Sequence, residues 1–435
     1  MANSHQRRPR GFRATAVVTA LIAASAGLVA CGDDGEGADG RAVLNWYVNP
    51  DGQEVMTQLA KDCSTDKYEI AAQFLPSSAT DQRTQLARRL AAEDSSTDLM
   101  SLDPVFIPEF ASAGWLTPFT GDLADKVMDD VLDGPASTAV WEDEVVAAPQ
   151  WANTQVLWYR KSLAEAAGLD MSKPVTWEQI IKGAADNGAT VGVQGNKYEG
   201  YMAWINALVL GAGGEIVTDT AAGRDAKVEI DSEAGKAAAT VIQRLADSKA
   251  AQPDLSVSNE GTSTGYMFPP GGGPGEFMVN WTFAYSNYAE TPEKDDLGWA
   301  RYPATVEGED SRPPIGGISI GVGAYGKHTD LAQDAALCLI SADTQKTLAV
   351  DNGMMPVGSS VYEAEELAKA YPKDLLNLWR ESIENGGPRP SSPFYSQISG
   401  AIQSTWHPPN SVNPDTTPRK SAEFLSDVLQ GKRLL

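Results

Sequence analysis

The chain has 435 residues, of which 34 are basic and 58 acidic, so its formal net charge is −24. A surface of this charge repels phosphate backbones, which argues against a nucleic-acid partner, and three cysteines are too few for a disulfide scaffold. With 42% hydrophobic residues the chain buries a core without help from a metal, and we expect an acidic globular protein without a cofactor.

The first thirty residues have the pattern of a secretory signal peptide. An arginine-rich start without acidic residues precedes an apolar run over 14–30, which ends in Leu28-Val29-Ala30-Cys31. This ending matches the bacterial lipobox, so we predict that 1–30 is cleaved, that Cys31 is lipidated, and that 31–41 is a flexible tether at the outer face of the cell membrane. The alternative is a short transmembrane anchor, because the run of about 17 residues is at the lower limit for a span. The pair Arg7-Arg8 leaves both Sec and twin-arginine export open.

Lipidation of Cys31 would leave two cysteines, Cys63 and Cys338. In an oxidising compartment one pair of this kind predicts a single disulfide. The alternative is two unrelated buried thiols.

The residues after the tether alternate short apolar runs with amphipathic stretches. Strands are predicted over 41–48, 68–75 and 97–102, and helices begin after Asp51, with Glu54 placed for a capping box, and after Asp81. In a β-α-β-α-β order the strands are parallel, so the loops that follow them all lie at the same edge of the sheet. Open α/β sheets bind their ligands at this edge.

The alternation continues along the chain and predicts an α/β fold. A capping box from Thr176 to Gln179 opens a helix, and 145–160 is predicted as a crossing strand. The other predicted strands are 277–283 and 316–322, and the predicted helices are 180–187, 201–210, 232–247, 331–341, 364–370 and 418–429. The proline-rich stretch 388–414 has no predicted element.

Two motifs known from enzymes overlap in one place. Residues 317–321 match G-x-S-x-G, but apolar residues alternate across the motif and favour a continuous strand over a nucleophile elbow. Residues 321–326 match G-x-G-x-x-G, but the next helix begins only near Thr329. We therefore expect a strand followed by a glycine-rich loop, and the two histidines left after cleavage, His328 and His407, do not suffice for a zinc cluster.

Polar and aromatic residues at predicted strand ends indicate a sugar site. Asp103 and Asn153 follow apolar strands, and Trp281 interrupts one. A pyranose offers an apolar face to an indole and a rim of hydroxyls to carboxylates and amides. The alternative is that the tryptophans are core residues and that Asp103 caps the next segment.

Together with the lipobox and the β-α-β-α-β start, several stretches resemble the substrate-binding lipoproteins of ABC importers, over essentially the whole mature chain. Within the carbohydrate-binding group, the resemblance is strongest to mycobacterial trehalose-binding lipoproteins. The stretches are Leu86–Leu90, Ser101–Asp103, Glu109–Trp115, Asn153–Arg160, Val279–Trp281, Ile315–Gly317 and Arg389-Pro390. Cys63 and Cys338 also lie where that family has cysteines.

The resemblance implies an α/β, two-lobed fold of the type II periplasmic-binding-protein kind, with lobes joined by crossing hinge strands. It assigns 42–149 and 312–360 to an N-terminal lobe, and 150–311 and 361–435 to a C-terminal lobe. It implies a monomer that is not an enzyme, that closes on a disaccharide or oligosaccharide such as trehalose, and that delivers it to permease subunits in the membrane. The implied ligand contacts are Asn49, Asp103, Asn153, Glu260, Trp281, Gly317 and Arg389.

One stretch departs from the family. Residues 269–275 are rich in proline and glycine where these proteins usually have a helix, which puts the contacts at the rim of the site in doubt. Three alternatives stay open: a binder of another sugar or polyol, a glycoside hydrolase that uses Asp103 and Glu260, and an adhesion or scaffold lipoprotein.

Overall fold

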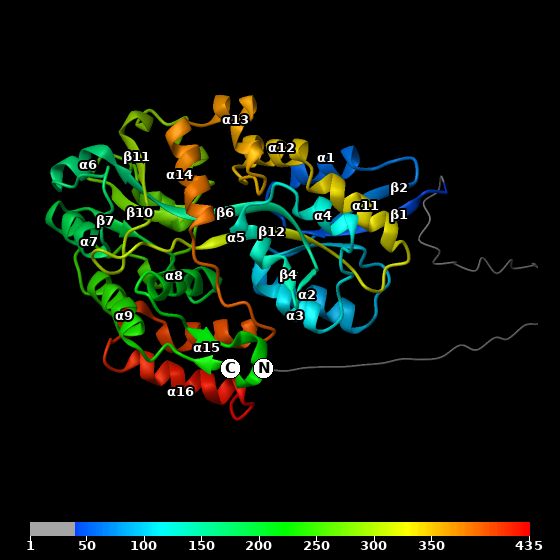
Figure 1. Cartoon of the computed structure of the whole chain (residues 1–435). Coiled ribbons are helices and arrows are strands. Elements are labelled where there is room, and N and C mark those ends of the chain that lie inside the picture. The colour runs from blue at the N-terminus through cyan, green and yellow to red at the C-terminus, as the bar shows by residue number, and fades with distance from the viewer. Residues whose placement is uncertain (1–39) are drawn as a thin grey trace, which may run out of the picture. The chain divides into compact units, whose positions relative to one another are not determined.

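One long strand, β6 (Ala148–Arg160), belongs to both halves of an eight-stranded sheet with the order β2-β1-β3-β12-β6-β10-β7, and β11 also pairs with β6. The computed structural model describes residues 40–435, so the predicted signal peptide and Cys31 lie outside the described residues. Up to Thr154, β6 pairs with β12 (Ile315–Val322), and from Gln155 it pairs with β10 (Glu276–Trp281). The strand therefore connects two lobes, as expected for the predicted fold (Figure 1).

The first lobe is built on the predicted β-α-β-α-β start. Strand β1 (Ala42–Val48) pairs in parallel with β2 (Tyr68–Phe74) and β3 (Leu99–Leu102), and β12 joins antiparallel to β3. Its helices include α1 (Gln53–Asp62), α2 (Ala79–Ala91), α11 (Thr329–Leu339) and α12 (Ala342–Asn352).

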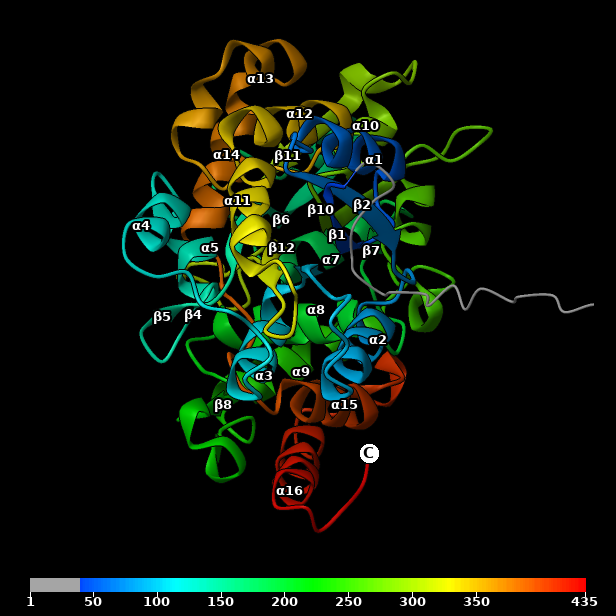
Figure 2. The same ribbon diagram turned by 90° about the vertical axis from the view of Figure 1, so that its right-hand side faces the viewer.

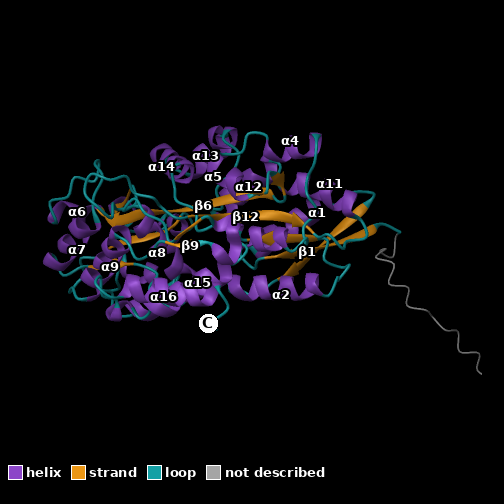
Figure 3. Ribbon diagram, turned by 60° about the horizontal axis from the view of Figure 1, so that its bottom comes forward, coloured by secondary structure: helices purple, strands orange, loops and turns teal. Residues whose placement is uncertain are grey.

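In the second lobe, β10 lies between β6 and β7 (Thr190–Gly192), and β11 (Leu297–Ala300) pairs with the end of β6. Figure 3 shows the strands between helices on either side. The longer helices of this part are α7 (Trp177–Asp186), α8 (Glu199–Leu210), α9 (Glu233–Ala246), α14 (Lys373–Glu384), α15 (Tyr395–Trp406) and α16 (Thr417–Leu429).

The remaining elements are short. The helices are α3 (Ile107–Ser112), α4 (Asp122–Met128), α5 (Asp133–Thr138), α6 (Lys161–Ala166), α10 (Ala284–Tyr288) and α13 (Glu365–Ala370), and the two small hairpins are β4 (Val140–Trp141) with β5 (Glu144–Val145) and β8 (Val217–Thr218) with β9 (Lys227–Val228). Among the helices of residues 40–435, none is long and apolar enough to cross a membrane.

Two helix starts differ from the prediction, and one agrees. Asp51 does not cap α1, which begins after a left-handed Gly52, and Asp81 does not cap α2, because the Ser78 hydroxyl accepts the hydrogen bond from the backbone of Asp81. The capping box at Thr176 is confirmed, with both reciprocal bonds to Gln179 present. Asp and Ser are equally good N-caps, so the sequence pattern alone does not distinguish Asp81 from Ser78, three residues upstream, as the cap of α2.

The proline-rich stretch contains a helix that the sequence analysis missed. Helix α15 spans Tyr395–Trp406 between Pro393 and the cis bond of His407–Pro408. The residues Ile398, Ala401 and Ile402 follow helical spacing and are buried. Figure 2 shows α15 close to α2 and α3 of the first lobe, and Ser396 donates a 3.5 Å hydrogen bond to Glu109 of α3.

The predicted disulfide is present. Cys63 ends α1 and Cys338 lies in α11, and their Cα atoms are 5.7 Å apart across a sequence separation of 275. The bridge lies beside the apolar core between these helices and the sheet of the first lobe.

Neither enzyme motif has the structure that its chemistry needs. Ser319 is buried in the middle of β12, where the chain does not turn. At Gly323, a Cβ would lie 2.0 Å from the carbonyl oxygen of Thr97, so this glycine allows two backbones to approach.

Candidate ligand-binding site

A cavity of about 720 Å³ is lined by residues of both lobes. This volume lies within the usual range for small-molecule sites. All seven residues that the sequence implied as ligand contacts line it: Asn49, Asp103, Asn153, Glu260, Trp281, Gly317 and Arg389.

The sheet explains why these residues meet. Asn49 follows β1 and Asp103 follows β3, and the two parallel strands end on the same edge. Trp281 is the last residue of β10, which runs antiparallel to β6 and brings the indole beside Asn153. The cavity therefore lies where the strand ends of the first lobe face β10 of the second.

Trp281 packs on a glycine. A Cβ on Gly316 would lie 3.2 Å from Cζ3 of the Trp281 indole, so the missing side chain makes room for the ring. The indole is partly exposed and lines the cavity. An apolar face of a ligand can stack on it there.

Asn153 fixes the segment that follows Trp281. Its Oδ1 atom accepts hydrogen bonds from the Thr282 hydroxyl at 2.9 Å, the Thr282 backbone at 3.3 Å and the Thr154 backbone at 3.0 Å. Its Nδ2 group is the part of the side chain that stays available to a ligand.

Gly317 also lines the cavity, and the pairing of its strand accounts for a glycine at this position. Its φ is +132°, and a Cβ would lie 2.2 Å from the carbonyl oxygen of Trp151. The strand pairing between β12 and β6 therefore demands glycine here, whether or not a ligand approaches.

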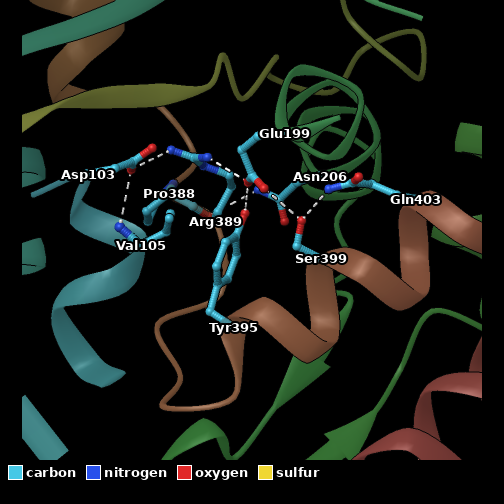
Figure 4. Close-up of polar contacts among 9 residues, drawn as sticks. All are labelled: Asp103, Val105, Glu199, Asn206, Pro388, Arg389, Tyr395, Ser399 and Gln403. Carbon is cyan, nitrogen blue, oxygen red and sulfur yellow. Dashed lines mark hydrogen bonds and ion pairs between the residues drawn. The ribbon is translucent and has the colours of Figure 1, made fainter. Parts of the chain in front are cut away.

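Arg389 joins the two lobes through a buried ion-pair network (Figure 4). Its side chain is 5% exposed and donates from one amino group to Asp103 at 3.0 Å and from the other to Glu199 at 2.7 Å. Burial opposes the charge, but Asp103, Tyr395 and Glu199 raise the pKa of the guanidinium above its ordinary value. Arg389 is thus held in one orientation at the wall of the cavity.

Asp103 has two structural roles at once. Its Oδ1 atom accepts from Arg389 and also, at 3.3 Å, from the backbone of Val105, so it caps the turn that begins at Pro104. Both interpretations of this residue from the sequence, as a cap and as a polar group at the site, therefore describe its position.

Glu199 is a cavity residue that the sequence analysis missed. It is the first residue of α8, and it accepts hydrogen bonds from Arg389, from the Tyr395 hydroxyl and, at 2.7 Å, from Ser399. Burial raises the pKa of Glu199, while Arg389 opposes this shift. An acidic residue at a helix N-terminus is ordinary in a sequence, and only the packing of α15 against α8 makes this one part of a network.

Glu260 lines the same cavity, and its Oε1 atom lies 3.0 Å from the place of a Cβ on Gly200, the residue after Glu199. Burial raises the pKa of the Glu260 carboxyl, the neighbouring Tyr198 and Trp281 side chains lower it, and the charge of Asp51 raises it further. Glu199 and Glu260 thus differ in their partners: Arg389 forms an ion pair with Glu199, whereas the neighbours of Glu260 are the neutral side chains of Tyr198 and Trp281.

The proline- and glycine-rich loop 269–275 is not at the rim of the cavity. It precedes β10, whereas Trp281 ends this strand, and its Gly273 carbonyl accepts a 2.6 Å hydrogen bond from Arg160 at the far end of β6. None of its residues lines the cavity. The doubt that this loop raised about the rim contacts was therefore misplaced.

Comparison with known proteins agrees with this architecture. The model of the family described as "Bacterial extracellular solute-binding protein" matches residues 38–346. The chain belongs to this family. Its members and structural neighbours are solute-binding proteins and not enzymes, so the glycoside hydrolase alternative is wrong.

Individual solute-binding proteins are similar to this chain, each over a different part of its length. The diacetylchitobiose-binding protein DasA of Streptomyces coelicolor is 23% identical over 348 residues, 76% of this chain and 78% of its own length. The mannitol-binding protein of Pseudomonas aeruginosa is 28% identical over 130 residues, which is 30% of each chain. The maltose-bound MalE3 structure of T. maritima has a TM-score of 0.76 at 24% identity and covers 90% of this chain and 100% of its own.

Proposed function

We propose that this solute-binding protein captures a disaccharide or oligosaccharide between its lobes for an ABC-type sugar importer. The observation that carries the proposal is the partly exposed Trp281 indole in a cavity rimmed by carboxylates, amides and one guanidinium. Sugars stack on such rings by their C–H faces and bind such polar groups by their hydroxyls. The names of the relatives, which bind diacetylchitobiose, mannitol and maltose, support the same class of ligand.

The first candidate ligand is trehalose, because the stretches around Asp103, Asn153, Trp281 and Arg389 resemble trehalose-binding lipoproteins. In this proposal Trp281 is the platform for one ring, and Asp103, Asn153, Glu260 and Arg389 bind hydroxyls. A polyol or another disaccharide is the second candidate, and the relatives that bind mannitol and diacetylchitobiose favour it.

Binding would proceed by closure of the lobes, which we place at 42–149 with 312–360 and at 150–311 with 361–435. The connections between the lobes are few, and β6 is one of them. A ligand that contacts both walls of the cavity stabilises the closed form relative to the open one. The closed monomer would then dock on the permease, and a lipid on Cys31 would hold it at the outer face of the membrane.

A thermal-shift panel tests the function. A ligand that binds only the folded protein raises its melting temperature by mass action, so we expect a shift with at least one of trehalose, maltose, diacetylchitobiose and mannitol. Trp281→Ala should weaken the binding by at least about tenfold, because the stacking surface is lost. Trp141→Ala, on the hairpin β4–β5 outside the cavity, is the matched control.

Two results would count against the proposal. Absence of a shift with every sugar and polyol would remove the sugar-binding function. Unchanged affinity in Trp281→Ala would show that the ligand binds elsewhere.

A further inference from the structure

The charged side chains that line the cavity are mostly acidic. Five carboxylates line it: Asp51, Asp103, Glu199, Glu260 and Asp351. Among the described residues that line it, Arg389 is the one cation, and both of its amino groups already bind Asp103 and Glu199. The other three carboxylates, Asp51, Glu260 and Asp351, therefore have no cation of their own among the lining residues.

Two of these carboxylates come from opposite walls of the cavity. Asp51 follows β1 in the first lobe, and Glu260 precedes β10 in the second. Both line the cavity, and the charge of Asp51 contributes to the raised pKa of the Glu260 carboxyl. Within residues 40–435, the ion pairs include none with either side chain.

Asn49 adds an independent observation at the same place. Its side chain is buried, with 3% exposed, and its Nδ2 group donates a 2.8 Å hydrogen bond to Asp51. This bond fixes the orientation of the amide and leaves Oδ1 as an acceptor, which is buried without a partner. A buried acceptor without a donor costs free energy that a suitable ligand group would recover.

Asn49, Asp51 and Glu260 together form what we call the acidic corner. Its acceptors are the unpartnered Oδ1 atom of Asn49 and the two carboxylates, which have neutral neighbours and no ion pair: Asn49 beside Asp51, and Tyr198 and Trp281 beside Glu260. Asn352 also lines the cavity, but its Nδ2 group packs against Gly52, 2.6 Å from the place of a Cβ on that residue. A neutral amide there leaves the charge of the corner uncompensated.

The chemistry of the acidic corner selects a group that donates and is positively charged. A hydroxyl donates one hydrogen and also presents lone pairs, whereas an ammonium presents three N–H donors and no acceptor. Hydrogen bonds from a cation to a carboxylate are shorter and stronger than neutral ones. We propose that the acidic corner binds a protonated amino substituent, so that the protein takes amino sugars in preference to neutral sugars of the same skeleton.

This proposal rests on the proposed sugar-binding function and narrows its ligand class. It also predicts that phosphorylated and carboxylated sugars are rejected, because an anion would approach uncompensated carboxylates.

Titration calorimetry of the full mature protein with matched sugars tests the proposal. One series has the trehalose skeleton: trehalose, trehalosamine, N-acetyltrehalosamine and trehalose 6-phosphate. A second has the β-1,4 skeleton: cellobiose, chitobiose and diacetylchitobiose. At about pH 6.5 a sugar amine is largely protonated, and we expect at least about tenfold tighter binding of the amine than of the neutral and N-acetylated partner in one series.

Variants locate the effect. Asp51→Asn keeps the shape of the side chain and removes its charge, so the ratio of the amine affinity to the affinity for the neutral sugar of the same skeleton should fall to about one. Asp66→Asn removes an exposed carboxylate of the same lobe outside the cavity and is the control. Higher salt should reduce the preference in the unmodified protein, because it screens the partly exposed corner.

The outcomes separate this proposal from the function on which it rests. If neutral sugars bind and the amines bind no better, the acidic corner is overturned and the sugar-binding function stands. If no sugar of either series or of the thermal-shift panel binds, both the amino-sugar proposal and the sugar-binding function are refuted. A preference for the amine that survives Asp51→Asn unchanged would overturn the assignment to this corner.

Discussion

The fully buried Glu276 should make the stability of the protein fall as the pH rises. This residue begins β10, its side chain packs beside Gly192, and neither carboxyl oxygen has a hydrogen-bond partner. Burial raises the pKa of Glu276 well above its usual value of 4.5, and the charge of Asp254 adds to this shift. Well below pH 4.5 the carboxyl is protonated in both the folded and the unfolded state, so this group then adds no pH dependence to the stability.

The size of the effect follows from proton linkage. Between the unfolded pKa and the raised folded pKa, the unfolded chain releases a proton that the folded protein retains, so the free energy of unfolding falls by about 1.4 kcal/mol per pH unit. Glu276→Gln has nearly the same shape and no titration, so the variant should lack this loss. From pH 5 upward its stability relative to the unmodified protein should therefore rise, by up to about 1.4 kcal/mol per pH unit, until the pH reaches the raised pKa of Glu276.

Urea unfolding at about pH 5, 6 and 7 measures this difference directly. Other carboxyls with raised pKa values, such as Glu199 and Glu260, contribute equally to both proteins and cancel. Glu309→Gln, at an exposed position, should show no such trend. A stability difference between Glu276→Gln and the unmodified protein that stays constant across this range would refute the reasoning.

Three further predictions concern the site and the first lobe. Asp103→Asn keeps the cap but loses the ion pair with Arg389, and calorimetry should show sugar binding weakened by about tenfold or more; an unchanged affinity would contradict the role of this pair. Gly316→Val should displace the Trp281 indole and weaken binding by about tenfold with the fold retained by circular dichroism, whereas Gly265→Val, which has open space, should not. Reduction of the disulfide should lower the free energy of unfolding by about 2–4 kcal/mol, and urea curves with and without reductant that coincide would contradict this.

The sequence was most informative where local chemistry decides the structure. The capping box at Thr176 depends on residues three positions apart, and the strands β1, β2 and β3 depend on short apolar runs, so all of them could be predicted. Helix α15 could not, because the prolines around it suggested an irregular chain, while its twelve residues contain none.

Some residues of the candidate site could likewise be predicted from the sequence, and others could not. Asp103 and Trp281 stand at strand ends, where a ligand edge is expected, and the resemblance supplied Arg389. The prediction that Asn153 follows a strand was wrong, because β6 continues through it to Arg160. Glu199 gave no signal, because its importance comes from Arg389, which lies 190 residues away in the chain. The burial of Glu276 could not be predicted either, since nothing in the local sequence distinguishes a buried carboxylate from an exposed one.

The continuity of β6 limits how this protein can change in evolution. Successive side chains of a strand point to opposite faces, so inserting or deleting a single residue near Thr154 would reverse the faces of every position beyond it. The side chains from Thr154 to Tyr159 are buried on both faces of the strand, so each would enter the core that packs against the opposite face, although nothing in the first lobe had changed. Length changes are therefore more tolerable in the loops of either lobe than in β6 beyond Thr154, whereas the half of β6 that pairs with β12 already contains one register shift, beside Ile318.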